Sequence, residues 1–139
     1  TFHIKKIVLM TFINIYFDKF HNNYFHKTTI QKAADENCIE VIYYLLQNFS
    51  EIENYLFYKN DKIEQIAIPP SITKIGWWSF CECPLLRGIA IPSTVTEIVD
   101  SAFEGCFDLK KIIIPLNLTK ISEETFSRCK NIKEIGFLS

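Results

Sequence analysis

The sequence predicts an α+β repeat protein in which a short solenoid of 23-residue repeats follows a small helical module. From Ile66 onward the same residue types return at every 23rd position, whereas the residues before that point have helical spacing instead. We therefore expect a helical N-terminal module and cap over residues 1–55. Residues 56–139 should then hold a half repeat, three full repeats and the start of a fourth.

Composition limits the classes of function. The 139 residues are 48% hydrophobic, which is enough for one modest domain or two very small modules and argues against a disordered chain. Fifteen basic and sixteen acidic residues give a formal charge of −1, so the chain lacks the electrostatic footprint of a nucleic-acid or anionic-membrane binder. We expect no nucleic acid among its partners.

The apolar run from Ile7 to Phe17 follows two lysines, in the order seen in signal peptides. No pair of small residues follows it for cleavage, and it is about half the ~20 apolar residues that a spanning helix needs. The run predicts a buried amphipathic helix, around Ile4 to Phe20, rather than a signal peptide or a transmembrane segment. Compartment stays open between cell surface and cytoplasm.

The stretch "TTIQKAADENCIEVIYYLLQN", residues 28–48, alternates alanine and leucine pairs at helical spacing. It resembles one ankyrin repeat, with Asn37 at the place of the glycine that turns between the two helices; asparagine tolerates left-handed backbone angles. Because one such unit cannot bury its own face, the preceding helix is expected to pack on it. A plain helical hairpin is the alternative.

Each repeat begins with an Ile-x-Ile pair followed by proline. The alternation puts both isoleucines on one face of a short strand, and proline ends that strand because it donates no backbone hydrogen bond. A second extended piece such as "TVTEI" follows, and "DSAFEGC" should then insert its phenylalanine into the core from a helical or 3₁₀ turn. Strands stacked about 4.8 Å apart bring equivalent side chains into contact. The expected structural ladder consists of Phe80, Phe103 and Phe126 with Cys83, Cys106 and Cys129.

The segment "IPSTVTEIVDSAFEGCFDLKKIIIP" resembles the BspA-type leucine-rich repeat, and the match extends over residues 66–137 with half a unit before it. Val99 and Ser122 depart from the family's preferred glycine, and Trp77 and Trp78 from its usual polar residues, which affects the local turns and not the fold. The resemblance implies a noncatalytic module for protein interaction or cell adhesion, of the kind found in surface antigens, that binds protein or glycan. The alternative is an intracellular scaffold piece, or a fragment of a longer repeat array without a ligand of its own.

Five cysteines raise the question of a metal site. Three of them recur once per repeat, and no second C-x-x-C pair accompanies "CEC", so the spacing predicts structural thiols and no zinc. Cys81 lies outside the recurring column and is expected to be exposed and reactive. His3, His21 and His26 do not share a helical face. No phosphate loop and no nucleophile with a base can be recognised, so we expect neither cofactor nor enzymatic activity.

The side chains between and just before the strand isoleucines should line the open face of the sheet. The predicted binding face consists of Arg87, Ala90, Lys110, Lys111, Ile113 and Lys133. Basic residues recur at 23-residue steps at Arg87, Lys110 and Lys133, and this basic column would stack into a positive stripe suited to an acidic peptide or a sulfated glycan. Ordinary solvation of an exposed face is the alternative.

Two further expectations concern the ends of the ladder. Trp77 and Trp78 occur only in the first full repeat, so at least one should pack towards the residues before the ladder, including Tyr55 to Tyr58. The last strand, near "IKEIGFLS", has no polar capping unit, which makes edge-to-edge self-association an expectation.

Overall fold

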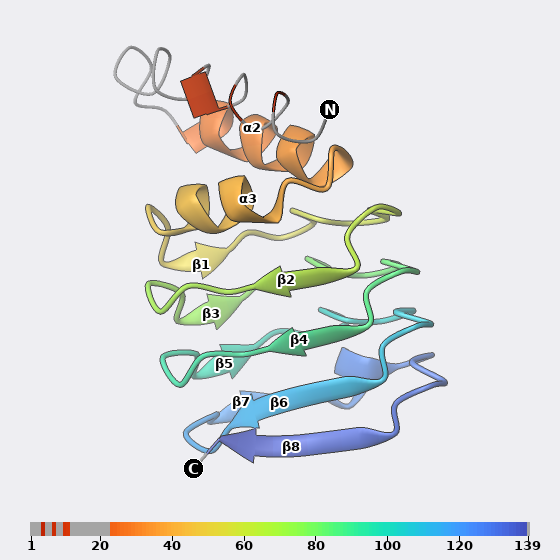
Figure 1. The fold of residues 1–139 in the computed structure, drawn as a ribbon. Helices are drawn as coiled ribbons and strands as arrows, with labels where there is room; N and C mark the ends of the chain where they lie inside the picture. The colour runs from red at the N-terminus through yellow and green to blue at the C-terminus, as the bar shows by residue number, and fades with distance from the viewer. Residues whose placement is uncertain (1–3, 5–6, 8–9, 12–22, 139) are drawn as a thin grey trace.

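The computed structural model describes residues 4, 7, 10–11 and 23–138. Within them, two helices precede a β-solenoid of about four turns with 23-residue repeats, and the helices lie on one end of the stack (Figure 1). The helix predicted around Ile4 to Phe20 lies outside the described residues, apart from the few residues named above. His3 and His21 also lie outside them.

The helical pair is α2, Asn23–Asp35, and α3, Ile39–Leu46. The chain turns between them at Asn37, which has a left-handed φ of 53°, as the glycine-like position in the sequence predicts. The apolar face of α3 is completely buried and forms one continuous core with the solenoid; its buried residues are Val41, Ile42, Leu45 and Leu46. A pair of helices therefore covers the first turn of the stack.

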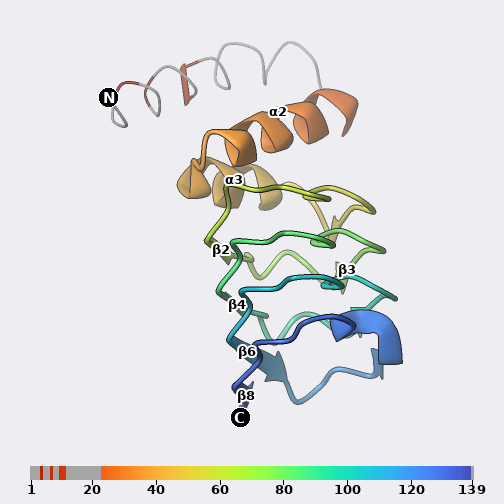
Figure 2. The same cartoon turned by 90° about the vertical axis from the view of Figure 1, so that its right-hand side faces the viewer.

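Each turn of the solenoid contributes one strand to each of two parallel sheets (Figures 1 and 2). One sheet has the order β2-β4-β6-β8, formed by Gln65–Ala67, Gly88–Ala90, Lys111–Pro115 and Glu134–Leu138. The other has the order β1-β3-β5-β7, formed by Glu51–Ile52, Lys74–Ile75, Glu97–Ile98 and Lys120–Ile121. The solenoid is therefore as the sequence period predicts.

The register of both sheets follows the 23-residue step, because every paired residue has its partner 23 positions along the chain, as in Ile66 with Ile89. The phenylalanines consequently lie one above another. Their rings are stacked with centroid separations of 5.0, 5.1 and 5.5 Å along the series Phe57, Phe80, Phe103 and Phe126. This aromatic column runs through the middle of the solenoid core.

The turn that carries each phenylalanine differs from the expected helical or 3₁₀ form in three of the four repeats. There the chain turns through a left-handed residue, at Tyr55, Trp78 and Ser101. Only the last repeat forms a 3₁₀ helix, η1, Glu123–Phe126, in which the Ser122 side chain accepts a hydrogen bond from the Glu124 backbone N–H at 3.2 Å. Serine at this position supplies the N-cap that the earlier turns lack.

The recurring thiols satisfy buried backbone carbonyls. Cys83, Cys106 and Cys129 each donate to the carbonyl oxygen of a phenylalanine in the preceding repeat, at 3.0 Å in every case. Asn60 holds the same column one repeat earlier: its Oδ1 accepts from the backbone N–H of Ile63 at 2.9 Å, and its Nδ2 donates to Asp35 of α2 at 3.3 Å. The thiol column thus begins with an asparagine that ties the solenoid to the helical pair.

The tryptophan expectation is confirmed for Trp78. Its ring makes an edge contact with Tyr55 at 5.1 Å and a stacked contact with Tyr58 at 6.2 Å, both from the residues before the first full repeat. Trp77 leans against Trp78 at 5.2 Å but remains 44% exposed. The two rings therefore join the first full repeat to the half repeat before it.

Candidate binding face

The outward face of the β2-β4-β6-β8 sheet carries two columns of side chains. The strands alternate between exposed and buried residues, so each isoleucine of the core column is flanked by outward positions. The register aligns one outward column as Gln65, Gly88, Lys111 and Glu134, and the second as Ala67, Ala90, Ile113 and Gly136. Half of these eight positions hold glycine or alanine, which leaves the face hollowed.

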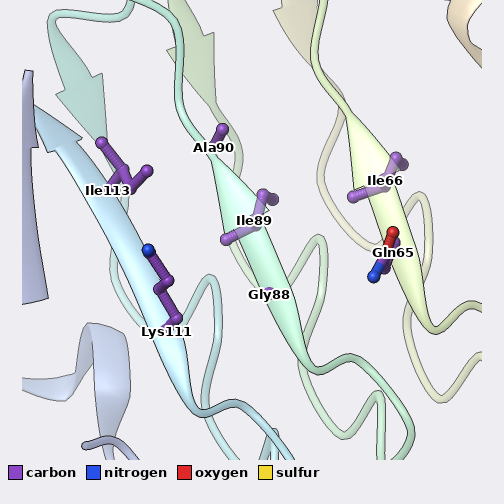
Figure 3. A pocket seen from close by; sticks show the side chains of 7 residues that line it. All are labelled: Gln65, Ile66, Gly88, Ile89, Ala90, Lys111 and Ile113. Carbon is purple, nitrogen blue, oxygen red and sulfur yellow. The ribbon is translucent and has the colours of Figure 1, made fainter. Parts of the chain in front are cut away.

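The hollow has a volume of about 290 Å³ and spans the first three strands of the sheet (Figure 3). Gly88 and Ala90 fill little of it, while Lys111 and Ile113 stand on the neighbouring strand. The residues that line it are Gln65, Ile66, Gly88, Ile89, Ala90, Lys111 and Ile113. One cationic group and one branched apolar group therefore border the same shallow cavity.

The predicted face residues fall into two groups. Ala90, Lys111 and Ile113 line the hollow, whereas Arg87, Lys110 and Lys133 lie just before their strands. Gln65 and Gly88, which the repeat pattern also places on the open face of the sheet, share a column with Lys111 and line the hollow together with Ile66 and Ile89.

The basic column of Arg87, Lys110 and Lys133 does stack. The backbone N–H of Lys110 donates to the Arg87 carbonyl, and the backbone N–H of Lys133 donates to the Lys110 carbonyl, both at 2.9 Å. It is not uniformly positive, however. Asp108 lies 3.2 Å from Arg87 Nε and 3.7 Å from Lys110 Nζ. These exposed ion pairs are worth at most about 1 kcal/mol each, so a ligand anion can compete with the aspartate.

A further ion pair crosses the face itself: Lys111 Nζ lies 3.2 Å from Glu134 on the next strand. The face is therefore a mixture of both charges around a hollow, and not a single positive field.

Neither a metal centre nor a membrane span is present in the described part of the chain. Across residues 4, 7, 10–11 and 23–138, no three histidine, cysteine or acidic side chains come together as metal ligands. Of the helices in the same residues, none is long and apolar enough to cross a bilayer.

The expectation that Cys81 is exposed and reactive is wrong. Its side chain is buried, with 5% exposure, in a turn that is hydrogen-bonded to the turns of both neighbouring repeats, from the Lys59 N–H to the Cys81 carbonyl at 2.9 Å and from the Glu82 N–H to the Glu104 carbonyl at 2.7 Å. Burial is the main reason that the pKa of the Cys81 thiol is raised to about 11, and the nearby Glu104 and Glu82 carboxylates raise it further. The thiol is therefore protonated at neutral pH and a poor nucleophile.

Cys129 is expected to be alkylated before Cys81. It is only partly buried, and interaction with the neighbouring Cys106 lowers its pKa, whereas burial raises that of Cys81 to about 11, so more of Cys129 is thiolate at pH 8. Brief treatment of the folded chain with iodoacetamide, followed by peptide mass spectrometry, should find modified Cys129 first. In 6 M guanidinium chloride the two should react alike, and faster labelling of Cys81 in the folded chain would contradict the assignment.

Two parallel sheets built from one short strand each per repeat, with a column of stacked phenylalanines between them, define a leucine-rich-repeat solenoid. The family model described as "BspA type Leucine rich repeat region (6 copies)" matches residues 50–139. The chain therefore belongs to the BspA-type leucine-rich-repeat family. No relative among curated proteins matches it.

Solved structures agree with this assignment over the repeats. A leucine rich cell surface protein from Faecalibacterium prausnitzii is 28% identical, with a TM-score of 0.53 over 65% of this chain and 30% of that one. The leucine rich repeat protein TpLRR of T. pallidum is 29% identical, with a TM-score of 0.62 over 65% and 42%. The pneumococcal vaccine antigen PcpA shares the fold at 21% identity and a TM-score of 0.58, over 64% and 24%. The chain thus spans less than half the length of each of these structures.

Proposed function

We propose that this chain is a noncatalytic interaction module that binds a protein or glycan through the outward face of the β2-β4-β6-β8 sheet. The observation that carries the proposal is the hollow over Gly88 and Ala90, bordered by Lys111 and Ile113. Solenoids commonly use such extended faces for binding. Repeats of this family are typically noncatalytic, and they suggest protein binding in general.

The chemistry of the face favours a ligand that carries both an anionic and an apolar group. Lys111 can receive a carboxylate or sulfate in exchange for Glu134, since the pair is exposed and weak. Ile113 and Ala90 offer an apolar surface beside it. An acidic peptide with an aliphatic side chain, or a sulfated oligosaccharide, has this combination.

Display at the cell surface, as in adhesion proteins and antigens, is part of the proposal. It draws support from the 28% identity to a leucine rich cell surface protein of F. prausnitzii. Pairing of a second copy along β8 also belongs to the proposal, because Ile135 and Phe137 of that strand are exposed.

The helical pair is proposed to be an ankyrin-like unit whose role is to cap the solenoid. The left-handed turn at Asn37 and the fully buried face of α3 support this assignment. The hydrogen bond from Asn60 Nδ2 to Asp35 Oδ1 fixes the helical pair to the half repeat that follows it.

Two variants test the sheet face against a heparin tetrasaccharide and a glutamate-rich peptide. Gly88→Trp should fill the hollow, because an added Cβ there meets nothing closer than the Lys111 carbonyl oxygen at 3.7 Å. The triple variant Arg87→Glu, Lys110→Glu and Lys133→Glu reverses the charge of the basic column. Both variants should weaken the binding of the probe about tenfold or more.

Lys120→Glu is the control for charge reversal, since this lysine is also exposed, at 75% against 54% for Arg87 and 53% for Lys110, but lies on β7 of the other sheet. Calorimetry with the full chain should find it unchanged. Equal affinity of the unmodified chain, the Gly88→Trp variant and the triple variant for whichever probe binds would defeat the proposal, as would failure of both probes to bind.

A further inference from the structure

A second hollow, of about 240 Å³, lies between α2 and the first repeat. Gln31 and Asp35 border it from the helix, and Tyr58, Lys59 and Asn60 border it from the repeat. It is smaller than the roughly 300–1,000 Å³ that drug-sized ligands occupy, so it has room for about one ring.

Polar groups with remaining hydrogen-bonding capacity line this hollow. Gln31 Nε2 donates to the Leu56 carbonyl at 3.3 Å, and Asn60 Nδ2 donates to Asp35 Oδ1 at 3.3 Å. These bonds fix the side chains in place. Among the described residues, these bonds use only one oxygen of the Asp35 carboxylate and none of the Gln31 side-chain oxygen, so both residues can accept further bonds.

Tyr58 continues from the hollow into an aromatic shelf, which we define as Tyr55, Tyr58, Trp77 and Trp78. Tyr58 contacts Tyr55 at 5.6 Å and Trp78 at 6.2 Å between ring centroids, and Trp77 follows at 5.2 Å from Trp78. Exposed fractions of 40%, 38% and 44% for Tyr55, Tyr58 and Trp77 leave ring surface open to solvent. The contacts hold the rings in fixed orientations, which lowers the entropy lost on binding.

The shelf lies on two successive connections, the one that leads from β1 to β2 and the one that leads from β3 to β4. Figure 2 shows these connections stacked on the side of the solenoid away from β2, β4, β6 and β8. This site is therefore separate from the sheet face, and either can fail a test without the other.

Charges beside the shelf are already balanced. Lys59 Nζ lies 3.6 Å from Glu82 and 5.3 Å from the centroid of the Tyr58 ring, and Arg128 lies 3.3 Å from the same glutamate. Glu53, next to the shelf in sequence, pairs with Lys27 of α2 at 3.5 Å. These balanced charges, with the Asp35 carboxylate in the adjoining hollow, favour a ligand without net charge over an anionic one.

We propose that the hollow and the shelf together bind a neutral oligosaccharide. The C–H groups on one face of a pyranose ring carry a small positive charge and pack on the negative face of an aromatic ring. Its hydroxyl groups can donate to Asp35 and Gln31 in the hollow. One sugar unit occupies the hollow beside Tyr58, and the next units lie along the shelf towards Trp77. A purely apolar protein segment would leave the acceptors of the hollow without partners, which disfavours that alternative.

The test uses the full chain and four uncharged probes, namely chitotriose, cellotetraose, maltotriose and mannotriose, with binding followed by saturation-transfer NMR and calorimetry. At least one probe should bind saturably. Trp77→Ala and Tyr58→Ala should each weaken it about tenfold, while Tyr58→Phe keeps the ring and should stay within about threefold. Asp35→Asn should weaken it as well, because a carboxylate is the stronger acceptor.

Phe107→Ala is the matched control, since Phe107 is 41% exposed but lies in a later repeat. It should leave the affinity within about twofold. Absence of saturable binding of all four probes at about 10 mM would overturn the proposal, because that corresponds to less than ~3 kcal/mol of affinity. Equal losses for Phe107→Ala and Trp77→Ala, or binding of an uncharged proline-rich peptide in place of the sugars, would overturn it too.

Discussion

Replacing Phe103 with alanine is expected to lower the free energy of unfolding by about 3–5 kcal/mol, the largest effect of any single substitution considered for this chain. The ring is completely buried and stacks on Phe80 at 5.1 Å and on Phe126 at 5.5 Å. Its loss leaves a cavity in the middle of the column that the flanking strands cannot close, because their register is fixed on both sides. Urea denaturation followed by circular dichroism measures the change.

Two alanine variants provide controls for Phe103. Phe126 is only partly buried and stacks on one ring, so Phe126→Ala should cost less. The exposed Phe107 should change stability by less than about 0.5 kcal/mol. A loss at Phe103 no larger than that at Phe107 would contradict a stacked core.

Gly76→Ala is expected to cost about 2–3 kcal/mol, because there is no room for a methyl group at this position. An added Cβ would lie 2.4 Å from the Ile52 carbonyl oxygen and 2.8 Å from the Asn54 backbone nitrogen, both in the preceding repeat. The Gly76 backbone N–H donates to that same Ile52 carbonyl at 2.8 Å, so the two segments of the chain cannot move apart without losing this hydrogen bond. Thermal and urea denaturation report the change.

Gly88→Ala is the control for backbone entropy. An added Cβ there meets only the Lys111 carbonyl oxygen, at 3.7 Å, and alanine restricts the unfolded chain more than glycine does. We expect this variant to be unchanged or more stable by about 0.4–1 kcal/mol. Similar destabilisation of the two variants would contradict the close contact at Gly76.

The close approach at Gly76 is local to the first full repeat. Val99 occupies the equivalent position one repeat later and makes the equivalent bond, from its N–H to the Ile75 carbonyl at 3.0 Å, without requiring glycine. Asn54 distinguishes the first case: its Oδ1 accepts from the Trp77 backbone N–H at 2.8 Å and lies 2.7 Å from the position of the missing Cβ. The sequence period marks the column but not which member is crowded.

The structural features that repeat every 23 residues could be predicted from the sequence. The 23-residue spacing of Ile66, Phe80 and Cys83 with their equivalents predicts the rungs, the aromatic column and the thiol column, because equivalent residues of a regular stack must lie one above another. The interior of the helical pair was readable for a similar reason, since helical spacing alone collects the apolar residues on one face. The boundary drawn after residue 55 stays a prediction, although β1 at Glu51–Ile52 already pairs with β3.

Side chains that do not recur were misjudged or missed. Cys81 was expected to be exposed because it lies outside the thiol column, yet its side chain is only 5% exposed, in a turn bonded to the turns before and after it. The basic column was expected to be positive, but Asp108, which has no equivalent in the pattern, pairs with two of its members. The burial of Cys81 and the pairing of Asp108 are both set by the residues of the adjacent repeat, which the position of a single residue in the sequence does not reveal.

The sequence by itself determined that this protein is a stack of 23-residue rungs with helices before it, because a period in residue type forces a period in space. Only the tertiary structure decided where that stack can bind. Hollows form where small side chains on one strand meet large ones on the next, as at Gly88 and Lys111, and an aromatic shelf forms where rings of two repeats come together, as at Tyr58 and Trp78. Such features depend on pairs of unlike residues in neighbouring rungs, and a repeat pattern records only the residues that are alike.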